Sequence, residues 1–146
     1  MNAVTLTWTE KIARVGTHML DNFEQAPTTL EHIFEPGVYI RRMTIPADTY
    51  FIGRPHRFGH KVVFTSGRFR LITEHNSQVL DAPYEMFTQP GHIVVLHTET
   101  PLVAHTEHLN PGECRDTELM ESLIFHAASE VRQISEAVER RLLGVG

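Results

Sequence analysis

The stretch KVVFTSGRFRLIT, residues 61–73, decides the fold class. Two runs rich in β-branched and aromatic residues flank Ser66-Gly67, a dipeptide typical of a turn. In the second run Phe69 and Leu71 alternate with Arg68, Arg70 and Ile72, which indicates a half-buried strand. The stretch therefore predicts two strands joined by a tight turn.

The same pattern of short strands and turns extends on both sides of this stretch, from about Val38 to Thr106. Turn signals occur at residues 35–37, 46–48, 75–77 and 89–91. Short strands at this spacing predict a β-sandwich or β-barrel. The predicted strands cover residues 38–45, 61–65, 68–73, 79–80, 86–87, 93–96 and 102–104.

A short helix is predicted at the N-terminus. Thr7 and Glu10 have the spacing of a capping box, in which a hydroxyl and a carboxylate satisfy free amide donors. Apolar residues then follow at helical spacing, and Pro27 ends the helix. These apolar residues, which we assign to core packing, are Ile12, Val15, Met19 and Phe23.

A long helix is predicted at the C-terminus, from Thr117 to Leu143, with Asp116 or Thr117 as its cap. As a single helix it would be about 40 Å long, and a kink near Ser129 could fold it back. Its apolar residues form a heptad seam, which could pack on the chain's own barrel or bind a second copy or another partner. The predicted contact residues on this seam are Met120, Ile124, Val131, Ile134 and Val138.

Length and composition favour one globular domain. The chain has 146 residues and a net charge of −5, which disfavours binding to nucleic acid. No apolar run approaches the roughly 20 residues that cross a membrane, and Met1–Glu10 lacks a signal-peptide pattern. Cys114 is the only cysteine, so no internal disulfide forms. Within the domain we expect a helical arm at 1–30, a barrel at 31–110 and a helical segment at 111–146.

Ten histidines are present, and two of them lie in the segment GRPHRFGH, residues 53–60. If this segment is extended, His56, Phe58 and His60 share one face. With Gly67, the segment resembles the first motif of the cupin superfamily, a glycine before His-x-His, then a glutamate and a closing glycine. Two registers stay open, and an expected histidine is replaced by Arg54 in one and by Phe58 in the other.

The second cupin motif, Pro-x-Gly followed by a histidine, is represented by Pro90-Gly91. Val94 stands at the expected ligand position, so the nearest candidates are on later strands. The direction in which His92 and His108 point depends on the strand register. A divalent metal (zinc, iron, manganese or nickel) needs three or four converging ligands. His56 and His60 are the candidates for two of these ligands, and His97 or His105 for a third.

A closer resemblance is carried by HIFEPGVYIRRMTIPA, residues 32–47, and its continuation into Gly53-Arg54-Pro55-His56. Ala82-Pro83, Pro90-Gly91 and residues 97–100 (HTET) continue the pattern. Over residues 31–124 the chain resembles small cupin-like proteins of tailed bacteriophages and prophages. The resemblance implies a mostly β fold, a single antiparallel cupin-like barrel of the jelly-roll type, between the short N-terminal helix and the long C-terminal helix.

Two functions follow as expectations. The first is a non-enzymatic bacteriophage structural or interaction protein, which forms homo-oligomers or binds other phage structural proteins, in the host cytoplasm during synthesis or in the virion. The second is a metal-dependent cupin enzyme, a dioxygenase, isomerase or sugar-modifying enzyme. No catalytic residue is assigned, because spacing does not single out Glu74, Tyr84 or Glu85.

Overall fold

The computed structural model describes residues 4–144, in two compact units. The helical unit comprises residues 4–25 and 126–144, and the β unit comprises residues 26–125. Residues 1–3 and 145–146, at the ends of the predicted segments 1–30 and 111–146, lie outside the described residues. No helix of the described residues is both long enough and apolar enough to cross a membrane.

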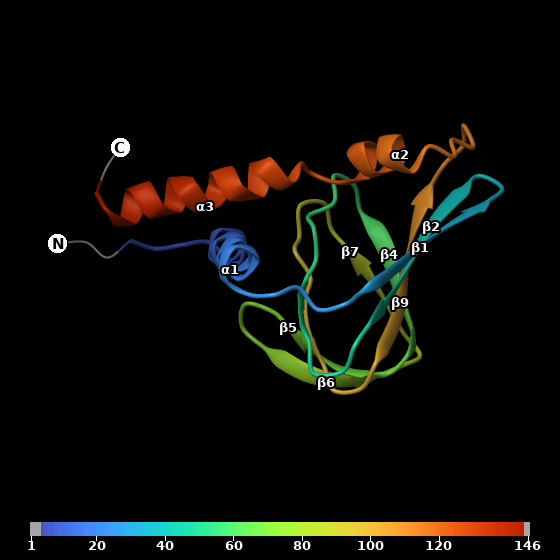
Figure 1. Cartoon of the computed structure of the whole chain (residues 1–146), viewed down its shortest axis with the longest axis horizontal. Helices are drawn as coiled ribbons and strands as arrows, with labels where there is room; N and C mark the ends of the chain where they lie inside the picture. The colour runs from blue at the N-terminus through green and yellow to red at the C-terminus, as the bar shows by residue number, and fades with distance from the viewer. Residues whose placement is uncertain (1–3, 145–146) are drawn as a thin grey trace. The chain divides into compact units, whose positions relative to one another are not determined.

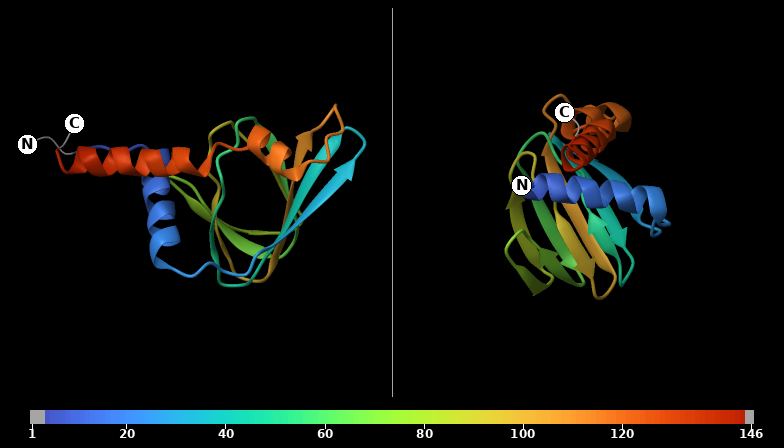
Figure 2. Two further views of the ribbon diagram at one scale, coloured as in Figure 1. Left: turned by 45° about the horizontal axis from the view of Figure 1, so that its top comes forward. Right: turned by 90° about the vertical axis from the view of Figure 1, so that its left-hand side faces the viewer.

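The β unit is built from two antiparallel sheets. One has the strand order β1-β2-β9-β4-β7 and the other β3-β8-β5-β6. β9 lies between β2 and β4 (Figure 1; Figure 2, right). The strands are β1 (Thr29–Glu35), β2 (Val38–Ile45), β3 (Tyr50–Ile52), β4 (His60–Ser66), β5 (Arg68–Ile72), β6 (Ser77–Asp81), β7 (Tyr84–Thr88), β8 (Val95–Thr98) and β9 (Leu102–Leu109).

The turn at Gly67 carries the chain from one sheet to the other. β4 pairs with β7 and β9, whereas β5 pairs with β6 and β8. Gly67 has a φ of +112°, and a Cβ at this position would lie 2.4 Å from the carbonyl oxygen of Pro101. Only glycine fits such a corner. The predicted strand–turn–strand stretch is therefore a sheet-to-sheet crossing.

The core of the β unit lies between the two sheets. Ile45, Phe64 and Leu102 from the five-stranded sheet are almost fully buried, as are Phe69 and Leu96 from the other sheet. The rings of Phe64 and Phe69 stack with centroids 4.2 Å apart. The predicted mostly β, jelly-roll architecture is confirmed, in the form of two facing sheets that do not close into a continuous barrel.

Two strands were not predicted from the sequence. β1 is an edge strand whose burial pattern lacks alternation, because Thr29, Leu30 and Glu31 are all exposed. β3 spans only three residues, which is too short for a periodic pattern. By contrast, the bounds predicted for β2 match the structure.

Helix α1 (Trp8–Asn22) has the predicted capping box, with the hydroxyl of Thr7 accepting from the Glu10 amide and the Glu10 carboxylate accepting from the Thr7 amide. In the helical unit α1 lies against α3 (Ala128–Leu142), as Figure 2 shows. Ion pairs at the surface join the two helices. They are Arg14–Glu139, Asp21–Arg132 and Glu10–Arg141.

The C-terminal helix predicted over residues 117–143 is interrupted. Helix α2 (Thr117–Ile124), capped by Asp116, ends where Phe125 becomes extended, with φ −101° and ψ 150°. The Phe125 backbone forms an isolated antiparallel bridge with His56, so strand-like pairing replaces the helix at this point.

The heptad seam is therefore divided. Met120 and Ile124 are buried beside Tyr39 in the β unit, whereas Val131, Ile134 and Val138 belong to the helical unit. Val138 is fully buried, and Val131 and Ile134 are partly exposed. Contact between this seam and a second copy stays a prediction.

Candidate functional site

The inward face of the five-stranded sheet changes from apolar to polar along its strands. At one end Ile45 of β2 pairs with Leu102 of β9. At the other end Tyr39 pairs with His108, and His60 of β4 pairs with Thr88 of β7. Side chains two residues apart share a face, so Tyr39 and Arg41 continue the inward row of Met43 and Ile45. Alternation along the strands thus places polar groups at one end of the core.

A cavity of about 200 Å³ occupies the space inside this face. Its deeper lining is apolar and comes from both sheets, with Val62, Phe64, Leu96, Leu102 and Ala104 among the residues. Its polar lining comes from one end of the β unit and comprises Arg41, Arg54, His56, His60, His105 and Thr106. Such an apolar hollow with a few polar groups is typical of a small-molecule site.

Three imidazole rings gather beside this polar end. His56 precedes β4, His60 begins it, and His108 lies near the end of β9. The rings of His56 and His60 stack with centroids 3.6 Å apart, and the His108 ring lies 5.4 Å from His56 and 5.6 Å from His60. His108 completes this cluster because the inward row of β9 runs through Leu102, Ala104 and Thr106 to His108.

Hydrogen bonds fix the proton on the His56 ring. Its Nδ1 lies 3.1 Å from the Arg54 carbonyl oxygen. A carbonyl can only accept, so Nδ1 donates and Nε2 keeps its lone pair. That Nε2 is buried and has no hydrogen-bond partner among the described residues. His60 Nδ1 faces the Phe58 carbonyl oxygen in the same way, at 3.4 Å.

The histidine cluster is held uncharged. Burial, together with the neighbouring imidazoles of His60 and His108, lowers the pKa of His56 to about 3. Burial, His60 and the Arg41 guanidinium lower the pKa of His108 to about 3. Burial also lowers the pKa of His60. At neutral pH the cluster therefore offers lone pairs and N–H donors without positive charge.

Two guanidinium groups lie against the aromatic ring of Phe125. The guanidinium carbons of Arg41 and Arg54 lie 4.5 and 4.2 Å from the centroid of its ring. The His56 ring lies 4.5 Å from the same centroid. The backbone is held as well, because Arg57 donates through its amide to the Ile124 carbonyl and through Nε to the Phe125 carbonyl. The segment after α2 is thus fixed at the polar end of the cavity.

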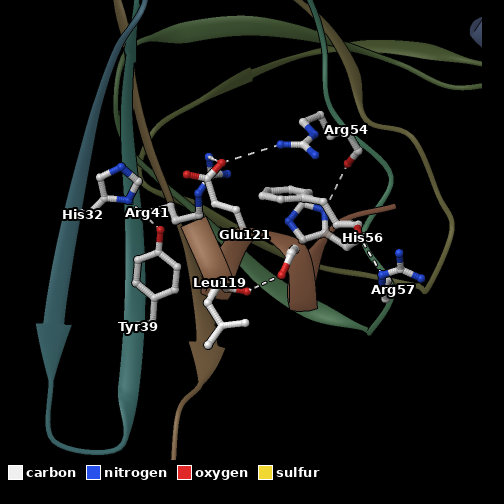
Figure 3. A network of polar contacts seen from close by, with 10 residues as sticks. His32, Tyr39, Arg41, Arg54, His56, Arg57, Leu119 and Glu121 are labelled. Atoms are coloured by element: carbon white, nitrogen blue, oxygen red, sulfur yellow. Dashed lines mark hydrogen bonds and ion pairs between the residues drawn. The ribbon is translucent and has the colours of Figure 1, made fainter. Parts of the chain in front are cut away.

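One carboxylate faces both arginines. Glu121 of α2 lies between Arg41 and Arg54 (Figure 3). Its Oε2 is 3.5 Å from Arg41 Nη2 and 3.6 Å from Arg54 Nη1. These ion pairs are longer than a hydrogen bond of about 2.7–3.2 Å. Both guanidinium groups therefore pair with the same carboxylate.

The four predicted metal ligands do not come together. His56 and His60 are adjacent, but His97 lies on the outer face of β8, 2.8 Å from Asp48 Oδ1. His105 borders the cavity, yet its Nε2 faces Glu107 Oε2 at 3.2 Å and its neighbours across the sheet are Arg42 and Val63.

The arrangement of imidazoles does not fit a metal centre as it stands. Among the described residues no three His, Cys, Asp or Glu side chains form a group that could hold a metal ion. Stacked rings such as those of His56 and His60 direct their nitrogens alongside one another, whereas metal ligands converge on one point. We therefore derive no chemical step through a metal.

Several site residues were not predicted as such. Arg41 lies in the predicted strand 38–45, where the alternation Tyr39, Met43, Ile45 already indicates an inward Arg41. Glu121 and Phe125 carry no local signal, because their role depends on where α2 ends.

No protein-family model matches the sequence, and no curated protein matches it either. Among solved structures, an RmlC-like cupin from Shewanella frigidimarina superposes with a TM-score of 0.50 at 12% identity, over 64% of this chain and 83% of that chain. The chain has a cupin-type fold.

Other solved structures superpose less closely. The cupin domain of an XRE family transcriptional regulator from Enterobacter cloacae matches at 14% identity with a TM-score of 0.48, over 60% of this chain and 99% of that domain. An HTH_3 family transcriptional regulator from Vibrio cholerae matches at 12% identity with a TM-score of 0.46, over 57% of this chain. The match spans about half, 51%, of that regulator. At such identities the likeness concerns the cupin fold alone.

The neutral histidine cluster predicts a stability that falls in mild acid. The pKa values of His56 and His108 are lower in the folded chain than the ordinary 6.5, so the unfolded chain takes up protons first as the pH falls. The free energy of unfolding should be highest above about pH 6.5 and decrease by about 2 kcal/mol or more between pH 7 and pH 5. Urea unfolding followed by circular dichroism measures it.

His108→Gln should flatten this pH dependence, because one of the imidazoles with a lowered pKa is gone. His75→Gln is the matched control, since the His75 side chain is 88% exposed. Equal slopes for the His108→Gln variant and the unsubstituted chain would contradict the assignment.

Proposed function

We propose that this chain is a non-enzymatic binding module that holds a small molecule inside its cupin-type β unit. The observation that carries the proposal is the cavity of about 200 Å³, which has an apolar interior and polar groups at one end only. An engineered apolar cavity of about 150 Å³ in another protein is large enough to bind benzene. A molecule with a ring or short branched chain and one polar end matches this size and polarity.

The surroundings of the cavity support binding more than turnover. The polar groups at its end are two arginines, one glutamate and imidazoles held uncharged by burial. Cys114 lies outside this lining, beside Tyr39 in the second core cluster. The arrangement offers recognition of a ligand without an activated nucleophile in the cavity lining.

Filling the cavity should abolish binding of an apolar probe. Ala104 lines the cavity and is 8% exposed, so Ala104→Leu places additional methyl groups in the space of the ligand. We expect toluene to raise the melting temperature of the unsubstituted chain and to have no effect on this variant. Thermal unfolding monitored by circular dichroism with and without toluene measures both.

Val103→Leu is the matched control, because Val103 directly precedes Ala104 on β9 and faces the other side of the sheet. It should retain the toluene effect. A chain whose melting temperature is unaffected by toluene and by every other small apolar probe would contradict a binding cavity.

A metal-dependent cupin enzyme is the second candidate, and one observation favours it. The buried lone pair on His56 Nε2 is the form of imidazole that binds a metal, and its Nδ1 hydrogen bond to a carbonyl is the kind that orients such ligands. Binding would require the rings of His56 and His60 to leave their stacked arrangement so that their nitrogens converge.

Metal content decides between the two candidates. The binding module should purify, without a His-tag, with well under one divalent metal per chain by elemental analysis. His56→Ala should leave that content unchanged, and His97→Ala serves as the control because His97 faces outward beside Asp48. One tightly bound zinc, iron, manganese or nickel that is lost in His56→Ala would favour the enzyme.

The bacteriophage setting and self-association also remain proposals. The sequence resemblance at residues 31–124 supports the first. The exposed apolar side chains of α1, among them Val15 at 48% and Leu20 at 61%, support the second. A chain that self-associates through its helical unit would act as a phage structural or interaction protein. Light scattering of the full chain should show a homo-oligomer that Leu20→Glu weakens, and a strictly monomeric chain would contradict self-association.

A further inference from the structure

Two buried polar atoms at the end of the cavity are left without partners among the described residues. They are Nε of Arg41 and Nε2 of His56, and each residue is only 9% exposed. Both residues line the cavity. The Arg41 guanidinium carbon and the His56 ring centroid each lie 4.5 Å from the Phe125 ring centroid, so they are at most twice that distance apart. One small molecule can therefore reach both.

The two atoms would bind different groups of that molecule. Arg41 Nε is a charged donor and binds an anionic oxygen best, because the edge formed by Nε and Nη matches the two oxygens of a carboxylate. His56 Nε2 is an acceptor, since its Nδ1 donates to the Arg54 carbonyl oxygen. It therefore binds a hydroxyl or another donor. An unpartnered buried group of either kind is unfavourable for the folded chain, and a ligand with both functions would supply the missing partners.

The charges around the site also favour a negatively charged ligand. The Glu121 carboxylate pairs with Arg41 at 3.5 Å and with Arg54 at 3.6 Å, and Arg41 Nε has no hydrogen-bond partner among the described residues. A ligand carboxylate could bind directly to Arg41 at this Nε. Glu121 is then a competitor of the ligand for the same guanidinium groups. The apolar remainder of the cavity has room for a ring or a branched alkyl group.

We propose that the ligand is a small 2-hydroxycarboxylic acid with an apolar side chain, whose carboxylate binds Arg41 and Arg54 and whose hydroxyl donates to His56 Nε2. This inference rests on the proposed function, because it names the ligand class of the same cavity. The apolar side chain lies against Val62, Leu96 and Ala104.

The test uses the full chain, treated with a chelator, and isothermal titration calorimetry with three probes of one shape. Mandelate has the carboxylate, the hydroxyl and a phenyl ring. Phenylacetate lacks the hydroxyl, and mandelamide lacks the charge. We expect one enantiomer of mandelate to bind at least about tenfold more tightly than either of the other probes. Equal binding of the three probes would overturn the ligand class while leaving the apolar cavity as a binding site.

Variants separate recognition from general stability. Arg41→Gln should weaken mandelate binding at least about tenfold, whereas Arg42→Gln, one residue along β2 on the outer face, should not change it. Glu121→Gln should tighten binding about threefold or more, because the competing carboxylate is gone. A merely structural Glu121 would not give tighter binding, and weaker mandelate binding in Glu121→Gln would overturn the competition.

Arg54→Gln is the second variant, to be used if Arg41→Gln does not fold. The Arg54 side chain is 45% exposed, so its substitution should disturb folding less. It should weaken mandelate binding and leave toluene binding unchanged. If toluene binds but no mandelate binding is detected, the hydroxy acid is wrong and the binding function stands. If neither binds, the proposed function fails as well.

Discussion

The pairing of β9 with β2 on one side and β4 on the other is the constraint on which the site depends. This central strand fixes which residues of three strands face inward, and its register opposes Tyr39 to His108 and Arg41 to Thr106. A slip of one residue would turn His108 outward and His105 inward. The apolar half of the same row, Ala104 and Leu102, opposes such a slip, because it would remove both side chains from the core that contains Phe69 and Leu96. The polar cluster is thus positioned by apolar packing at the other end of the strand.

The second determinant is the point at which α2 ends. Ile124 is buried beside Tyr39, and one residue later the backbone of Phe125 pairs with His56 and accepts from Arg57. If α2 continued as a helix, this bridge would be lost and the Phe125 ring would not lie near both guanidinium groups. Phe125 therefore lines the cavity together with Arg41, Arg54 and His56, and Glu121 of α2 pairs with both arginines. The residues that make these contacts are far apart in the sequence, but all of them belong to the β unit.

Local patterns were sufficient for the fold and insufficient for the site. Alternation and turn glycines predicted β2 with its bounds and the corner at Gly67, because both signals come from neighbouring residues. His56 and His60 lie together as expected, but the shared face predicted for an extended segment is wrong for Phe58, because the chain bends at Arg57 and Phe58 and the Phe58 side chain is 67% exposed. The third imidazole, His108, could not be chosen over His97 or His105, since the direction of each depends on pairing with distant strands. A kink in the C-terminal helix was left open near Ser129, but its position at Phe125 could not be predicted for the same reason. The heptad spacing of Ile124 and Val131 persists, whereas the backbone pairing of Phe125 is tertiary.

Buried polar groups are unfavourable for the stability of a small β unit, which makes their concentration at one place informative. Arg41, His56 and His60 are each 9% exposed or less, and two of them have a polar atom without a partner among residues 4–144. Leucine or phenylalanine at these positions would extend the core that already surrounds Phe64 and Phe69. Sequences break such local rules mainly where function requires it. The neutral imidazoles and the unpartnered Nε of Arg41 support the proposal of a site for an external polar group, since apolar residues at these positions would stabilise the fold more.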